Sequence, residues 1–344
     1  METNINKNLN KNGIYSDFIN EIIKSKNDNA LFFFIGAGVS ISQGYPTWDD
    51  YVEQLIEYWK FNLPNIYKKN TSENNDDFSF KDLNLLNELK QSTMSKKRKI
   101  DYVNYLIKKR CEKIAENEKY DSDFYYQRES LDFEKFLFSE IVPINAVNSV
   151  LDELMNIKSS FITTNYDNQI EKSYDNKFGI KPSVVSDFSS DFKEITDSTI
   201  IHLHGTPTSD PKFFINSSTN YSKIYFGKSL NTYREKLEML FKNKHNVSII
   251  FIGCSMEEDE VLSLFDLKDE KYKFYSIMKY DSNEPELSDF TNEYYRKTKN
   301  IQFIWYGEKF EELPIFLHQL NDDINKNGME KGRTPEDIEK ILLG

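Results

Sequence analysis

The sequence predicts an α/β protein with a Rossmann-like parallel sheet and helices on both faces of that sheet. From residue 159 onward, short apolar runs alternate with amphipathic helical patterns, and such alternation is typical of parallel sheets. Residues 31–35 form one continuous apolar run, as expected of a strand that is buried on both faces. This run ends at Gly36-Ala37-Gly38, and turns at the carboxyl ends of parallel strands are where such sheets bind ligands.

The elements near the amino terminus are predicted from apolar spacing and from capping residues. Ser16 is expected to cap a first helix, because apolar side chains follow it at helical spacing. Thr47 is expected to cap a later helix, with Asp50 completing an acidic variant of the capping box. The apolar stripe of this later helix indicates packing against a core. Its members are Trp48, Tyr51, Val52, Leu55, Ile56 and Trp59.

The middle of the chain, residues 62–158, carries long charged helical patterns and no convincing strand. We therefore predict an all-helical insertion between the first and second strands of the sheet. Two basic runs, residues 96–99 and 108–110, fall in this region. We interpret them as a solvated helix face, with a contact to a partner or to nucleic acid as the alternative.

Strands and helices alternate through the rest of the chain. The predicted strands are residues 161–164, 199–203, 247–252, 273–277 and 301–305. The predicted helices are residues 168–173, 232–242, 258–265 and 310–320. The segment after Asp322 contains Gly328, Gly332 and Pro335 and is expected to be a linker with a short helix. We thus expect one domain over residues 14–325 and a tail over residues 326–344.

The composition excludes several classes of protein. The net charge is −12, which disfavours direct nucleic-acid binding, because such binding needs clustered positive charge. No apolar run reaches the ~18 residues of a membrane span, and the amino terminus lacks an apolar signal segment. We therefore expect a cytoplasmic protein with no membrane contact.

Polar side chains stand where two of the predicted strands end. Asn165 carries an amide, which can donate to and accept from a water or a sugar hydroxyl, although Asn is also a common turn residue. His204 has the chemistry of a general base, since an ordinary imidazole pKa is near ~6.5; a buried structural histidine is the alternative. His202 and His204 would share one face of a strand. A third metal ligand is missing, so we predict no metal site.

Four segments, each at the end of an apolar run, resemble the sirtuin superfamily in their order along the chain. They read GAGVS with GYPTW (residues 36–40 and 44–48), SFITTNYD (160–167), IIHLHG (200–205) and IIFIGCS (249–255). The resemblance covers nearly the whole chain. It is strongest to the sirtuin-like proteins of bacterial antiphage defence, which degrade NAD.

The sequence departs from related patterns at three places. Ile41 occupies the position of the third glycine of a dinucleotide fingerprint, which disfavours a plain dehydrogenase. Asp49-Asp50 stands where sirtuins usually carry an Arg. Cys111 and Cys254 are the two cysteines of the chain. They cannot form the four-cysteine zinc module of protein-deacylating sirtuins.

The resemblance implies a role for each matched residue. Asn165 and His204 would be catalytic, with His204 as the general base beside the nicotinamide ribose. Asp167 would orient Asn165 or a ribose hydroxyl, or would cap the next helix. The remaining matched residues would bind NAD. Gly36, Ala37, Gly38 and Ser40 would hold its pyrophosphate, and Pro46 and Trp48 would belong to the loop that covers it. Gly253 and Ser255 would contact its adenosine or its phosphate.

The function implied is hydrolysis of NAD, as substrate, to nicotinamide and ADP-ribose by a gated effector of abortive infection. One alternative is a sirtuin-type NAD-dependent protein deacylase. Another is a non-enzymatic subunit that binds NAD or ADP-ribose. Because a cytoplasmic NADase is toxic, we expect gating by assembly of a homo-oligomer or by a partner protein such as a HerA-type ATPase or a short Argonaute.

Overall fold

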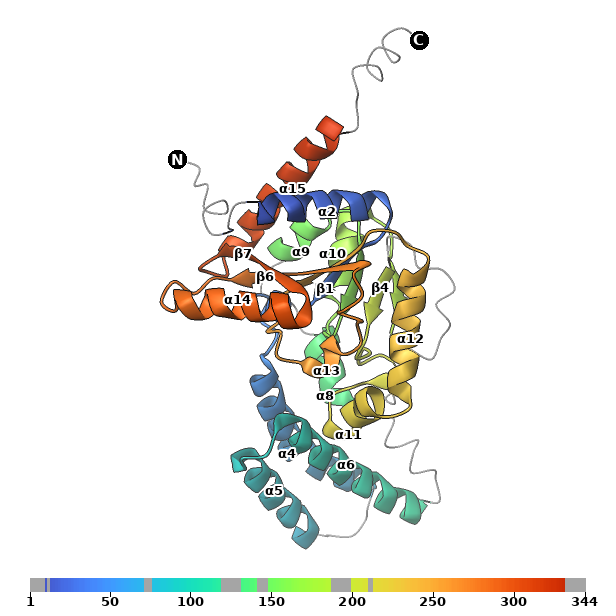
Figure 1. Ribbon diagram of the computed structural model, residues 1–344. Coiled ribbons are helices and arrows are strands. Elements are labelled where there is room, and N and C mark those ends of the chain that lie inside the picture. Colours follow the sequence, from blue (N-terminus) through green and yellow to red (C-terminus); the bar gives the residue numbers. More distant parts are fainter. Residues whose placement is uncertain are drawn as a thin grey trace.

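The computed structural model describes Asn10 and residues 13–70, 76–118, 131–140, 148–186, 199–209 and 213–331. Within these residues, seven parallel strands form one sheet in the order β3-β4-β2-β1-β5-β6-β7 (Figure 1). The strands are β1 Leu31–Ile35, β2 Ser160–Thr163, β3 Ser183–Val185, β4 Thr199–His202, β5 Val247–Ile252, β6 Tyr272–Lys279 and β7 Ile301–Gly307. The predicted Rossmann-like α/β fold is confirmed.

Strand β1 lies in the middle of the sheet, and its side chains serve both faces. Phe33 and Ile35 pack into the core on one face, whereas Phe32 and Phe34 pack into the core on the other. All five residues of the strand are buried. Each such side chain contributes about 1.5–3 kcal/mol through burial. The run is therefore apolar throughout because neither face of the strand meets water.

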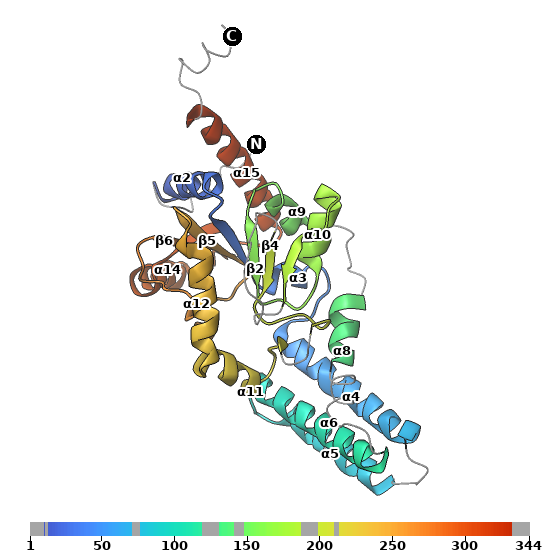
Figure 2. The ribbon, with the colours of Figure 1, turned by 90° about the vertical axis from the view of Figure 1, so that its right-hand side faces the viewer.

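Helices cover both faces of the sheet (Figure 2). One face carries α2 (Ile14–Asn27), α9 (Ser149–Leu154), α10 (Gln169–Phe178) and α15 (Glu312–Lys331). The other carries α11 (Ser218–Tyr221), the π-helical turn η3 (Ser222–Phe226), α12 (Ser229–Lys242), α13 (Asp259–Leu262) and α14 (Pro285–Lys299).

The order in which strands are added to the sheet changes side at β1. Strands β2, β4 and β3 lie on one side of β1, and β5, β6 and β7 lie on the other. Ile35 is paired with Ile252 at the carboxyl ends of β1 and β5. The loops that follow these strands therefore start side by side, at the kind of switch point where open α/β sheets bind ligands.

A helical subdomain projects from this edge of the sheet (Figures 1 and 2). It comprises α4 (Trp48–Asn70), α5 (Asp76–Gln91), α6 (Lys96–Glu118), α8 (Asp132–Lys135) and the π-helical turn η1 (Phe136–Glu140). These helices pack around an apolar core to which Tyr45, Tyr166 and Phe214 from loops of the sheet domain also contribute. As predicted, the described residues of this region are helical. Residue 62 falls inside α4, and α9 packs on the sheet, so the subdomain starts earlier and ends earlier than residues 62–158.

The cap of α4 is as predicted, but the cap of the first helix is not. Thr47 Oγ1 accepts from the Asp50 N–H at 3.2 Å and donates to Asp50 Oδ2 at 2.7 Å. Helix α2 begins at Ile14 after Gly13, whose φ is 94°. The expected cap at Ser16 is therefore wrong, because Ser16 already lies inside the first turn.

Three other parts of the fold differ from expectation. The sequence patterns do not predict strand β3 or helix α14; in α14 the apolar side chains of Leu287, Phe290 and Tyr294 are exposed and none of its residues is buried. Helix α15 continues to Lys331, past the linker expected after Asp322, and residues 332–344 lie outside the described residues. None of the described helices combines the length and apolar character that crossing a membrane requires.

Candidate functional site

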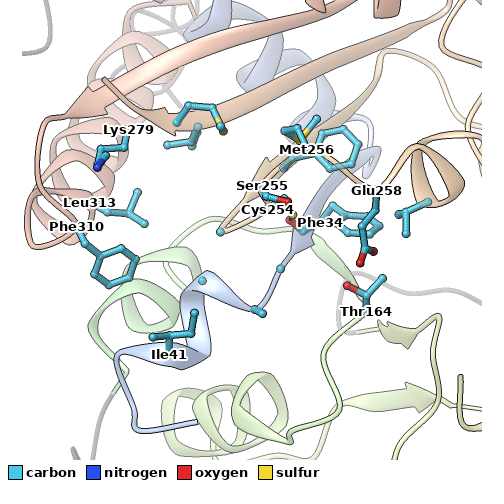
Figure 3. Close-up of a pocket in the computed structure, with 18 of the residues that line it drawn as sticks. Phe34, Ile41, Thr164, Cys254, Ser255, Met256, Glu258, Lys279, Phe310 and Leu313 are labelled. Carbon is cyan, nitrogen blue, oxygen red and sulfur yellow. The ribbon is translucent and has the colours of Figure 1, made fainter. Parts of the chain in front are cut away.

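Two adjoining cavities lie at the carboxyl edge of the sheet. The larger, about 480 Å³, lies against the loops that follow β1 and β5 and reaches α15 (Figure 3). The smaller, about 120 Å³, lies between the start of α4 and the loops that follow β2 and β4. Both are lined by Ala37, Trp48, Thr164 and Glu258. The larger cavity has the size of a typical ligand site, about 300–1,000 Å³.

The glycines after β1 and β5 bring two loop backbones into contact at the floor of the larger cavity. A Cβ on Gly36 would lie 2.5 Å from the Gly253 oxygen, and one on Gly38 would lie 2.9 Å from it. Gly253 itself has a φ of +69° and no room for a side chain beside Val39. These positions need glycine because the two backbones touch.

The same contact corrects the expected mode of phosphate binding. The Gly36 N–H donates to the Ile252 oxygen at 2.8 Å, and the Gly38 N–H donates to the Gly253 oxygen at 2.9 Å. Both groups therefore hold the loops together and are not free for a pyrophosphate. The helix that follows, α3 (Gly38–Ile41), has only four residues.

Asn165 is buried beneath this loop and held in one orientation. Its Nδ2 donates to the Gly36 oxygen at 3.0 Å and to Ser40 Oγ at 3.1 Å, and its backbone N–H donates to Thr163 Oγ1 at 2.9 Å. Both amide hydrogens are thus used, and Asn165 lines the smaller cavity. Its Oδ1 is the atom left to accept a hydrogen bond from a water or a sugar hydroxyl.

Asp167 performs both of the roles that the sequence left open. It accepts from the Gln169 N–H at 3.0 Å at the start of α10, and it accepts from the Ser40 hydroxyl. Ser40 in turn accepts from Asn165. Burial raises the pKa of Asp167, and the hydrogen bonds from Ser40 and Gln169 oppose this shift. Ser40 therefore belongs to a chain that orients Asn165.

His204 is buried in an aromatic environment beside the smaller cavity. Its Nε2 lies 2.6 Å from the Tyr225 hydroxyl, and the Tyr221 ring stands edge-on to it at 5.1 Å. Burial, with a smaller contribution from Lys97, lowers the pKa of His204 to about 3. The imidazole is therefore neutral at physiological pH and can accept a proton or a hydrogen bond, although its low pKa makes it a weak base.

His202 does not share a surface with His204, contrary to expectation. Strand β4 ends at His202, and His204 lies in the turn that follows. His202 Nδ1 lies 2.9 Å from the backbone carbonyl oxygen of Asn165, and Nε2 lies 2.8 Å from Glu171 Oε1. Burial opposes the charged form, but Glu171 and the Asn165 carbonyl raise the pKa of His202 overall. His202 thus stabilises the loop that carries Asn165 through a contact with the Asn165 backbone carbonyl. The part of the chain that the structure describes contains no cluster of three potential metal ligands.

The other predicted binding residues line one or both cavities. Pro46 and Trp48 line the smaller cavity, and Trp48 also lines the larger one. Gly253 and Ser255 line the larger cavity. Ser255 Oγ accepts a long hydrogen bond of 3.4 Å from the Glu257 N–H, which leaves the hydroxyl able to bind a ligand.

Sequence reasoning missed two lining residues and one neighbour of His204. Tyr221 and Glu258 line the cavities, and Tyr225 contacts His204. The four-residue spacing of the two tyrosines is a weak signal for one helix face. Glu258 stands in an acidic run that gives no indication of a cavity.

A comparison with known families agrees with this arrangement. Residues 159–304 match the family model of the SIR2-like domain. The match includes Asn165, His204, Gly253 and Ser255, whereas the loop after β1 lies outside it. It supports the resemblance to sirtuins and a function that involves NAD. No curated protein matches the chain.

Proposed function

We propose that the protein is an NAD glycohydrolase, which converts NAD and water to nicotinamide, ADP-ribose and one proton. The observation that carries this proposal is the shared lining of the smaller cavity by Asn165 and His204. This cavity adjoins the larger one, since Ala37 and Trp48 line both. A dinucleotide in the larger cavity could therefore extend its nicotinamide end toward both side chains.

Hydrolysis of this bond requires the protein mainly to position NAD and a water molecule. The bond between the ribose carbon and the nicotinamide nitrogen breaks, and its electron pair leaves with nicotinamide, which becomes neutral. The oxygen of water bonds to the same carbon and loses a proton. Asn165 Oδ1 would hold the water or a ribose hydroxyl, and neutral His204 would accept a hydrogen bond or the proton. Groups that act in this way contribute about 10²–10⁴-fold each.

A protein deacylase is the second candidate on the basis of the family match alone. It would need room for an acylated lysine beside the nicotinamide end of NAD. The smaller cavity measures about 120 Å³ and is walled by Tyr45, Phe138 and Tyr166. This confined, aromatic space favours water over a peptide side chain as the acceptor.

The proposed activity is tested by the release of nicotinamide from NAD. We expect Asn165→Ala and His204→Ala each to lower the rate by about 10²–10⁴-fold. The matched controls are Asn156→Ala and His245→Ala, at exposed positions, which should retain the full rate. Release that depends on an acetylated peptide would instead identify a deacylase. Tight binding of NAD without any turnover would indicate a non-enzymatic binding subunit.

We further propose that the NADase serves as a gated effector in defence against phage. Support comes from the resemblance of its four motifs to such effectors and from the toxicity expected of free NAD hydrolysis in a cell. Expression of the active protein with its trigger should deplete cellular NAD and halt growth. The Asn165→Ala variant under the same conditions should do neither.

A further inference from the structure

Glu258 lies where the two cavities meet, at a place no sequence motif indicated. It immediately precedes α13 and lines both the larger and the smaller cavity. Figure 3 shows its carboxylate turned toward Thr164, away from Ser255 and Met256. Among the described residues, none donates a hydrogen bond to this carboxylate. Glu258 is exposed, so its carboxylate can meet a ligand that spans both cavities.

The two ends of the larger cavity carry side chains of opposite charge. In the described part of the chain, Glu258 and Lys279 are the charged side chains that line it. They stand at opposite ends of the cavity in Figure 3, with Cys254 and Ser255 between them. A carboxylate repels phosphate and attracts hydroxyl groups and positive charge. A dinucleotide should therefore place its phosphates toward Lys279 and a sugar at Glu258.

The surroundings of Glu258 act on its carboxylate in opposite directions. The protein around the side chain limits its hydration and raises the pKa of Glu258, whereas Lys97 lowers it. Lys97 comes from α6 of the helical subdomain. Its Nζ lies 3.4 Å from the centre of the Tyr221 ring and 3.5 Å from Glu260 Oε1. The positive charge thus lies beside the site, where it offsets part of the effect of lost hydration.

We propose that Glu258 is a substrate-binding residue that receives the nicotinamide ribose. Its carboxylate accepts hydrogen bonds from the ribose hydroxyls and stabilises the positive charge that develops on this sugar as the bond to nicotinamide breaks. The proposal rests on the NADase function proposed above. It assigns Glu258 to the ribose next to Asn165 and His204 and assigns Lys279 to the phosphates.

The test compares Glu258→Gln with Lys279→Gln in steady-state NAD hydrolysis. Glu258→Gln should lower kcat by about 10²-fold, as when one group that stabilises a transition state is lost. Lys279→Gln should raise KM about tenfold through the loss of a charged contact in the ground state, with kcat nearly unchanged. The matched control is Glu257→Gln, the same charge change at an exposed neighbour that lines neither cavity.

Calorimetric binding of ADP-ribose separates this proposal from the NADase function. Glu258→Gln should weaken ADP-ribose binding about tenfold relative to the full chain and to Glu257→Gln. That result would stand even if the unmodified protein released no nicotinamide, in which case only the NADase function would fail. Unchanged kcat and unchanged ADP-ribose binding in Glu258→Gln, with normal thermal stability, would overturn the proposal. A gain of activity on NADP in this variant would overturn it too, since it would place Glu258 at the adenosine ribose.

Discussion

Ser40 links the segment after β1 to the loop after β2 in one polar chain. It accepts from the Asn165 amide and donates to the Asp167 carboxylate, while Asp167 accepts from the start of α10. The family resemblance assigned Ser40 to the phosphates of NAD. Its side chain instead accepts a hydrogen bond from Asn165 Nδ2 and so stabilises the orientation of the Asn165 amide. The sequence motif thus placed Ser40 at the site, whereas its contacts show that it binds Asn165 and Asp167.

Replacing Ser40 tests this chain. Ser40→Ala removes one of the two acceptors of Asn165 Nδ2 and leaves the other, the Gly36 oxygen. We expect kcat for NAD hydrolysis to fall about tenfold, because one net hydrogen bond is worth about 0.5–1.5 kcal/mol. KM should change little, since Ser40 orients a catalytic group. A rise in KM at constant kcat would return Ser40 to the phosphate site. Ser42→Ala, two residues away, is the control.

The buried neutral state of His204 predicts how stability depends on pH. Its pKa is lowered to about 3 in the folded protein but is near ~6.5 in the unfolded chain. Below the unfolded value the unfolded chain binds the extra proton, so folding stability falls as the pH drops from about 6.5 toward 3. At pH 5 the cost is on the order of 2 kcal/mol.

Urea unfolding at two pH values measures this effect. The free energy of unfolding should fall between pH 7.5 and pH 5 by about 2 kcal/mol more in the unmodified protein than in His204→Gln. His202 contributes in the opposite direction, because its folded pKa is raised, but it is present in both proteins and cancels. An equal loss in the two proteins would show that His204 is protonated when folded.

At the scale of elements, the loops after β1 and β5 form the floor of the site through direct backbone contact. Gly36, Gly38 and Gly253 allow this approach, and two hydrogen bonds fix it. The capped start of α4 then brings Trp48 over both cavities. From the helical subdomain, Tyr51 donates to Glu134 at 2.7 Å and accepts from Asn216 at 2.9 Å. This buried link connects that subdomain to the segment after His204.

A methyl group at Gly36 should separate the two loops. In Gly36→Ala the new Cβ would meet the Gly253 oxygen at 2.5 Å and Cys254 Sγ at 2.7 Å. We expect a loss of about 1–3 kcal/mol in the free energy of unfolding, as for overpacking, together with weaker NAD binding. The control is Gly179→Ala, which meets nothing within 4 Å and should affect stability alone, by about 1 kcal/mol, through its left-handed backbone. Equal effects of the two variants on NAD binding would contradict the role of the loop contact.

At the scale of the whole molecule, a sheet-based domain carries a helical subdomain beside its site. Lys97 and Asp101 of α6 both contact α11: Lys97 lies over Tyr221, and Asp101 accepts from the Thr219 N–H at 3.1 Å. Tyr221 packs edge-on against His204. A change in the position of α6 would therefore reach His204 through one intervening ring. The subdomain also exposes large apolar side chains, Phe80 at 64% and Tyr105 at 68%.

We predict from this arrangement that activity depends on assembly. The isolated chain should form a homo-oligomer with low NAD turnover, and a partner protein such as a HerA-type ATPase or a short Argonaute should raise turnover by favouring one state of the site. Light scattering and nicotinamide release, measured with and without the partner, provide the test. Phe80→Lys with Tyr105→Lys should weaken assembly, because exposed apolar side chains favour association. A monomer that hydrolyses NAD at its full rate alone would refute this prediction.

The sequence by itself determined the class of fold and the edge of the sheet that carries the site. Short continuous apolar runs such as β1 are typical of strands buried on both faces, and their alternation with helices indicates a parallel sheet. The carboxyl ends of parallel strands lie at one edge, so the sequence placed Asn165, Gly253 and the loop after β1 at the same edge of the sheet. Local chemistry also determined the cap of α4, because Thr47 and Asp50 interact within one helical turn.

Only the tertiary structure decided what each polar group does. Ser40 and Asp167 lie more than a hundred residues apart, and the strand order places them in contact. The turn after β4 separates His202 from His204, which no strand periodicity reveals. Burial among tyrosines from η3 and α11 lowers the pKa of His204, and a loop after β5 sets Glu258 between two cavities. Hydration and electrostatic interactions depend on distances between atoms in space. The sequence predicts such distances only for residues that lie close together along the chain.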